Sequence, residues 1–130
     1  MNHQAVNVYG STGLHSGITD ASPEKLIELL LDGVTSRLNG AVAAMQSGEI
    51  AKKGELVGKA LGIIDYLRAI LDYEAAPDFV SNLTELYSYM ERRVMRANFD
   101  NDPAALSEVV DLLNEIRSGW SAVDRAEVNQ

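Results

Sequence analysis

Residues 22–48 read SPEKLIELLLDGVTSRLNGAVAAMQSG and decide the fold. Ser22 offers an N-cap hydroxyl, Pro23 suits the first helical position, and Gly48 suits a left-handed cap after the last turn. Between these signals, apolar residues recur every three or four positions, which is the spacing of one helix face. They are Ile27, Leu30, Leu31, Val34, Leu38, Ala41, Val42 and Met45. The stretch therefore predicts one amphipathic helix over about 23–46.

Three further segments show the same spacing, at about 50–74, 79–98 and 103–123. Pro77 and Pro103 punctuate the chain between them, and no run alternates between apolar and polar residues as a strand would. Four helices joined by short connections place each helix antiparallel to the next. The sequence therefore predicts an all-α, antiparallel up-down-up-down four-helix bundle over residues 20–124, followed by a C-terminal tail at 125–130.

The first nineteen residues differ from the rest because every charged side chain lies at Asp20 or beyond. Residues 1–19 show no sustained helical or strand period, so we expect a mobile arm that docks on the bundle as a cap. Val6, Tyr9 and Leu14 are its candidate anchors. The arm has no Lys or Arg and no apolar run, so we do not expect a signal peptide. No part of the chain approaches the ~18 consecutive apolar residues of a membrane span.

The composition narrows the function classes. The 130 residues carry 11 Lys and Arg against 19 Asp and Glu, and the net charge of −8 argues against nucleic acid or an anionic membrane as a partner. The one basic cluster, Arg92, Arg93 and Arg96, is too small to reverse this. The absence of cysteine suits a reducing cytosol, and the two histidines, His3 and His15, both fall in the arm. We therefore expect no catalytic residue, no metal and no cofactor in a cytoplasmic binding protein.

The apolar stripe of the 50–74 helix is wider than a bundle core needs. Leu56, Ile63 and Ile70 are spaced by seven and widen a complete stripe to roughly 180°, whereas a core-facing arc needs little more than ~100°. Leu112 widens the stripe of the 103–123 helix in the same way. One interpretation is deeper core packing in a twisted bundle. The interpretation we favour is a groove that accepts a partner helix.

Gly54, Gly58 and Gly62 form a small-residue series on the flank of the same helix. Each costs about 1 kcal/mol in helix propensity relative to alanine. Close approach of the arm or of a partner backbone explains the series, and local flexibility explains it equally well.

The chain resembles the flagellar secretion chaperones that are specific for flagellin, and the resemblance covers almost its whole length. Its carriers are Tyr9, Ala21-Ser22-Pro23-x-x-Leu26-Ile27, Leu31-Asp32-Gly33, Lys59-Ala60, Ile63-Ile64-Asp65, Asn82-Leu83-x-x-Leu86-Tyr87-x-Tyr89-x-x-Arg92-Arg93, Ala97-Asn98 and Trp120. Each piece is weak alone, but their order and spacing are specific. The chain departs from the family pattern at Gly58, at Gly62 and at Ala75-Ala76-Pro77.

The resemblance implies a cytosolic, non-enzymatic chaperone of the flagellar type III export pathway. It implies that the chain binds the disordered C-terminal segment of flagellin, blocks premature polymerisation, and docks on the cytoplasmic domain of the export gate's membrane protein. The arm around Tyr9 would cap the groove and take part in the hand-over. On this basis we assign the flagellin-binding groove to Leu56, Ile63, Leu67, Ile70, Val109 and Leu112. Tyr89 and Arg93 flank the inward stripe of their helix as further partner contacts.

Two alternatives from other classes stay open. One is a bundle enzyme that carries a ligand or a metal. The other is a homo-oligomer that uses the wide stripe as its own interface and is a homodimer when free.

Overall fold

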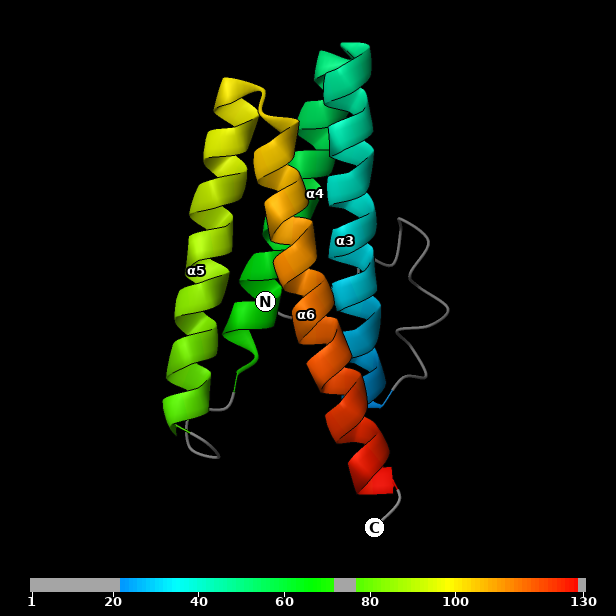
Figure 1. The fold of residues 1–130 in the computed structure, drawn as a ribbon, viewed down its shortest axis with the longest axis vertical. Coiled ribbons are helices and arrows are strands. Elements are labelled where there is room, and N and C mark those ends of the chain that lie inside the picture. Colours follow the sequence, from blue (N-terminus) through cyan, green and yellow to red (C-terminus); the bar gives the residue numbers. More distant parts are fainter. Residues whose placement is uncertain (1–21, 72–76, 129–130) are drawn as a thin grey trace.

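Four helices account for the described part of the chain, which in this computed structural model comprises residues 22–71 and 77–128. They are α3 (Pro23–Ser47), α4 (Ile50–Ala69), α5 (Pro77–Asp100) and α6 (Pro103–Val128). Consecutive helices run antiparallel, and no strand occurs in these residues (Figure 1). The predicted all-α, up-down-up-down bundle is confirmed. The arm, residues 1–19, lies outside the described residues.

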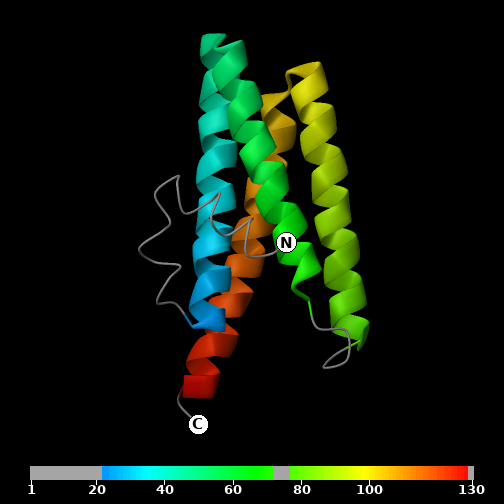
Figure 2. The same cartoon turned by 180° about the vertical axis from the view of Figure 1, so that it is seen from behind.

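The helices form a closed ring in which α3 packs against α4 and α6, and α5 packs against the same two helices from the other side. The helices α4 and α6 are therefore diagonal to each other, as are α3 and α5. Both views show α5 and α6 diverging toward the start of α5 and the end of α6 (Figures 1 and 2). The seam between α5 and α6 is the most open of the four.

Local sequence explains where the helices begin and end. All three prolines of the chain open a helix, because a proline fixes the backbone in a helical conformation and lacks only a hydrogen-bond donor that the first turn does not use. The Ser22 hydroxyl accepts a hydrogen bond from the backbone N–H of Lys25 at 3.2 Å, as the sequence predicts. Gly48 and Asn101 have φ angles of 74° and 55°, so a left-handed residue follows α3 and α5.

Three predicted boundaries differ from the structure. The helix α4 ends at Ala69 rather than near residue 74, and α5 begins at Pro77 rather than at 79, because the proline is its first residue and not a separator. The helix α6 continues to Val128 rather than stopping at 123. No glycine or proline interrupts residues 121–128, so the tail predicted at 125–130 is helical through Val128.

The core is a single apolar cluster to which all four helices contribute side chains. Its fully enclosed members include Leu30, Leu38, Ile64, Met90 and Leu113, each 0% exposed. Burial of one such side chain contributes about 1.5–3 kcal/mol, so this cluster supplies most of the driving force for folding. None of the described helices is long and apolar enough to cross a bilayer.

Gly54 and Gly58 lie inside α4, and beyond the local helix backbone no heavy atom lies within 4 Å of a Cβ built on either of them. We expect Gly54→Ala and Gly58→Ala each to raise the free energy of unfolding by up to about 1 kcal/mol, because alanine is the better helix former and meets no clash. Urea denaturation followed by circular dichroism measures this change. As a control, Gly48→Ala is expected to lower stability, since its φ of 74° disfavours a Cβ. Loss of stability at position 54 or 58 contradicts the prediction.

Candidate functional site

The apolar row predicted on α4 lies along the seam between α3 and α4. A Cβ built on Gly40 of α3 would lie 3.0 Å from Cδ1 of Leu56. The Leu56 side chain therefore packs closely against α3 at a position where Gly40 has no side chain. Ile63 is fully buried and Leu67 is 2% exposed, whereas Leu56 and Ile70 are partly buried and pack against the core. Only the two ends of the row therefore reach the surface.

The predicted site residues of α6 lie at a different seam. Val109 is fully buried in the core, and Leu112 is partly buried against it. Leu112 follows Glu108 by one helical turn, and Glu108 bonds to α5, so both residues occupy the α5 side of α6. Because α4 and α6 are diagonal, the structure places the four predicted residues of α4 and the two of α6 on different sides of the ring.

Periodicity shows that an apolar stripe is wide, but it does not show which neighbouring helix covers the extra width.

Tyr89 and Arg93 lie together at the α5–α6 seam, and both bind Glu108. The Tyr89 hydroxyl donates to Oε2 of Glu108 at 2.6 Å, and Nε of Arg93 donates to Oε1 at 2.8 Å. The sequence pointed to Tyr89 and Arg93 but missed the carboxylate that joins them. We call Tyr89, Arg93 and Glu108 the Glu108 clamp. A partner that contacts Tyr89 and Arg93 has to pack against this clamp or displace it.

The clamp shifts the pKa of each member in the direction its hydrogen bonds require. The hydrogen bonds from Tyr89 and Arg93 lower the pKa of the Glu108 carboxyl, because both donors favour its charged form. The same hydrogen bond to Glu108 raises the pKa of the Tyr89 hydroxyl, and the bond to Glu108 raises the pKa of Arg93. The ionised carboxylate is therefore the form that holds α5 to α6.

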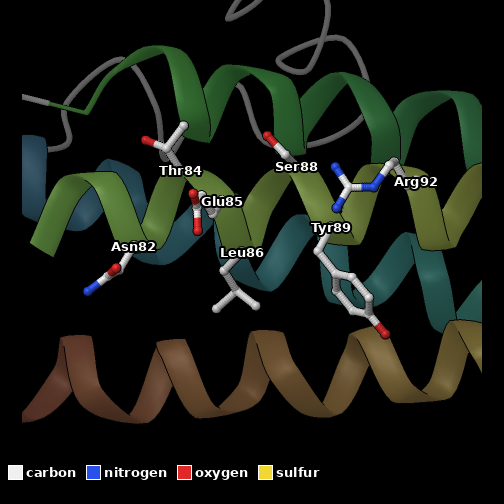
Figure 3. Close-up of a pocket in the computed structure, with 7 residues that line it drawn as sticks. All are labelled: Asn82, Thr84, Glu85, Leu86, Ser88, Tyr89 and Arg92. Atoms are coloured by element: carbon white, nitrogen blue, oxygen red, sulfur yellow. The ribbon is translucent and has the colours of Figure 1, made fainter.

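A shallow pocket of 570 Å³ lies along the outer side of α5 (Figure 3). Leu86 and Tyr89 point from α5 toward α6, while Thr84 and Ser88 point toward α4, and Arg92 lies beyond them. The lining combines one apolar side chain with several hydroxyl, amide and charged groups. Such a surface suits contact with a polypeptide better than enclosure of a small apolar ligand.

Arg68 joins α4 to α5 on the other flank of this helix. Its Nη1 donates to Oγ of Ser88 at 3.1 Å and lies 3.3 Å from Oε1 of Glu91, while its Nη2 donates to Asp65 at 2.6 Å. Burial raises the pKa of the Glu91 carboxyl, and Arg68 partly offsets this shift. Polar groups thus hold α5 on both sides.

Several large apolar side chains that the sequence analysis did not single out are exposed. Phe79 is 64% exposed, because it lies in the first turn of α5 where α6 diverges. Ile50, Met95 and Phe99 are 76%, 52% and 81% exposed. The hydrophobic period cannot find such residues, because they lie off the core stripe or at a helix end.

The arm residues Val6, Tyr9 and Leu14 and both histidines lie outside the described residues. In residues 22–71 and 77–128, no group of His, Cys, Asp or Glu side chains is arranged to hold a metal ion. A helical bundle whose described surface combines partly buried apolar seams with polar clamps has features that suit a protein-binding module.

Comparison with known proteins identifies the family. Residues 5–127 match the family model "Flagellar protein FliS". The chain is 42% identical over 120 residues to the flagellar secretion chaperone FliSB of Pseudomonas aeruginosa, covering 92% of this chain and 95% of that relative. It is 39% identical to the flagellar secretion chaperone FliS of Vibrio cholerae, with 92% and 88% covered. It is 40% identical to that of Salmonella typhimurium, with 91% and 88% covered.

The chain therefore belongs to the FliS family of flagellar secretion chaperones. This confirms the resemblance that the sequence motifs indicate.

The Glu108 clamp makes stability depend on pH with a definite sign. The folded-state pKa of Glu108 is lowered from 4.5, so its contribution is present above pH 4.5 and is lost as the pH falls through the folded value. We expect the urea midpoint of the native protein to fall more steeply between about pH 6 and pH 3 than that of Glu108→Gln. Glu115→Gln, an exposed change on α6, is the control and should follow the native curve. Identical curves for Glu108→Gln and the native protein would contradict the clamp.

Proposed function

We propose that this chain is a cytosolic, non-enzymatic export chaperone that binds the C-terminal segment of flagellin. In this proposal, binding prevents premature polymerisation, and the loaded chaperone delivers its client to the cytoplasmic domain of the flagellar type III export gate. Support comes from the family membership and from relatives named flagellar secretion chaperones at about 40% identity. The sequence resemblance supplies flagellin as the client.

The observation that carries the proposal is the partial burial of large apolar side chains along helix seams. Leu56 and Ile70 remain partly exposed on the α3–α4 side, and Leu86 and Leu112 on the α5–α6 side. A client helix that inserts apolar side chains would complete their burial, at about 1.5–3 kcal/mol for each well-buried side chain before the cost of ordering the client. A client that wraps around the bundle can use both seams.

The buried members of the predicted set take a supporting role in this proposal. Ile63 and Leu67 are the buried members of the α4 row, between Leu56 and Ile70, and Val109 is buried in the core on the helix that carries Leu112. Val6, Tyr9 and Leu14 in the arm cover the α4 row until the client arrives, and they act in the hand-over. That role of the arm rests on the family resemblance. Tyr89 and Arg93 would contact a partner at the rim of the second seam.

The burial of Ile63 decides which variants can test the row. An aspartate at position 63 would place a charge in the core and unfold the protein, so lost binding would prove nothing. Aspartate at Leu56 or Ile70 perturbs a partly exposed side chain and is the better probe.

We expect Leu56→Asp and Ile70→Asp each to weaken binding of a flagellin C-terminal peptide by about tenfold or more, because each places a charge in a contact that has to be apolar. Isothermal titration calorimetry measures the affinity, and circular dichroism verifies the fold. Leu112→Asp tests the second seam in the same way.

Ala51→Asp on α4 and Asn114→Asp on α6 are the matched controls, because both positions are exposed and each gains the same negative charge. Unchanged affinity in both α4 variants with an intact fold would exclude the α4 row as the client site. Absence of binding between the native protein and full-length flagellin would exclude the proposed function.

A further inference from the structure

A second surface lies at the end of the bundle where α4 begins and α5 ends (Figure 1). We define this end patch by Ile50, Met95, Phe99, Arg92, Arg96 and Lys53. The first turn of α4 and the last turn of α5 are held together there, because Nζ of Lys53 donates to the backbone oxygen of Asn98 at 3.1 Å and to Oδ1 of Asn101 at 3.2 Å. The three apolar members are therefore gathered at one end of the molecule.

The apolar members of the end patch are unusually exposed. Phe99 is 81% exposed, Ile50 76% and Met95 52%, whereas most large apolar side chains of the described helices are buried or packed against the core. Met95 and Phe99 are four residues apart, so they share one outward face of α5. A single exposed apolar residue needs no explanation, but a group of them on one face indicates a contact surface.

The charges of the end patch are positive in a protein whose net charge is −8. The Arg96 guanidinium lies 5.6 Å from the centre of the Phe99 ring, so a cation lies directly beside the most exposed apolar side chain. Its ion pair with Asp100 is at the surface and is worth little. Arg92 has no ion pair within the described residues, and the two hydrogen bonds of Lys53 go to uncharged oxygens.

Several acidic groups of the neighbouring helix surfaces are paired with cations outside the end patch. Glu55 pairs with Lys59, Glu91 with Arg68 and Glu108 with Arg93. Glu49 and Asp102 also lie at this end; they accept hydrogen bonds from the Ser47 hydroxyl and the Ala105 backbone and keep their negative charge. The end patch presents exposed cations around apolar side chains, and neither Arg92 nor Lys53 forms an ion pair within the described residues.

We propose that the end patch binds an acidic segment of a partner protein, which places apolar side chains on Met95 and Phe99 and carboxylates on Arg92 and Arg96. A second copy of this chain fits less well, because a symmetric contact between two patches would bring these arginines toward each other. The apolar members of the end patch lie apart from the α4 row assigned to the client, whereas Arg92 also lines the α5 pocket beside Leu86 and Tyr89.

The test uses the full-length, ¹⁵N-labelled protein and two synthetic amphipathic helical peptides. In both peptides leucine recurs at i and i+4; glutamate fills the remaining positions of one peptide, and lysine fills those of the other. A protein with a net charge of −8 would ordinarily favour the lysine peptide. We expect the glutamate peptide instead to shift the amide resonances of residues 50–53 and 92–101, and to bind more weakly as salt is raised.

We expect Phe99→Ala to weaken binding of the glutamate peptide about fivefold or more, and the double variant Arg92→Glu with Arg96→Glu to weaken it about tenfold or more. Phe79→Ala is the matched control, because Phe79 is an exposed phenylalanine near the opposite end of the same helix. It should leave the affinity unchanged. All of these positions are exposed, so the fold should survive, and circular dichroism verifies it.

Three results would overturn the proposal. They are tighter binding of the lysine peptide at the end patch, resonance shifts confined to other residues, and equal effects of Phe99→Ala and Phe79→Ala. A dimer of the free chain that Phe99→Ala dissociates would assign the patch to a second copy instead. Phe99→Ala should leave the affinity for the flagellin peptide unchanged, so failure of the end patch and failure of the proposed chaperone function can be told apart.

Discussion

The bundle depends on the burial of the apolar stripe of α3. Leu30 and Leu31 are adjacent in the chain and both are buried, as are Val34 and Leu38, so the stripe is too wide for one neighbouring helix to cover. The helices α4 and α6 therefore pack against α3 from its two sides. Polar contacts reinforce this arrangement at the rim: Arg117 of α6 lies 3.1 Å from Asp32, and Nε1 of Trp120 donates to the backbone oxygen of Glu24 at 3.2 Å.

The position of α5 follows from this constraint. Since α3 already lies between α4 and α6, α5 completes the ring from the opposite side and packs mainly against those two helices. Arg68 holds one flank of α5 through Ser88 and Glu91, and Glu108 holds the other through Tyr89 and Arg93. A helix held in part by rim contacts keeps more of its surface free. This explains why the pocket of Figure 3 lies on α5, as do the most exposed aromatic side chains of the described residues.

The sequence specified the fold well because its signals are local. Each signal acts within one helix: a capping serine, a proline at a helix start, and an apolar period of three to four residues. The structure contains each of these features. The end of α6 was misplaced because no residue after 123 carries a stop signal. The candidate site was harder to predict, because the burial of a side chain depends on which neighbouring helices cover it. Leu56 and Leu112 both widen an apolar stripe, but only the ring order of the helices shows that they face different seams, and only the packing shows that Ile63 is enclosed.

The surfaces of α4 and α5 differ in chemistry in a way that suits two kinds of partner. The row on α4 is apolar and partly covered, so a ligand gains there mainly by burying hydrocarbon, an interaction that salt hardly weakens. The end patch adds Arg92 and Arg96 to exposed Met95 and Phe99, so binding there is steered by charge and is sensitive to salt. A chaperone has to retain its client while it meets and leaves a second protein. In the two proposals made above, the row on α4 retains the client and the end patch makes the transient contact, and these two surfaces share no side chain.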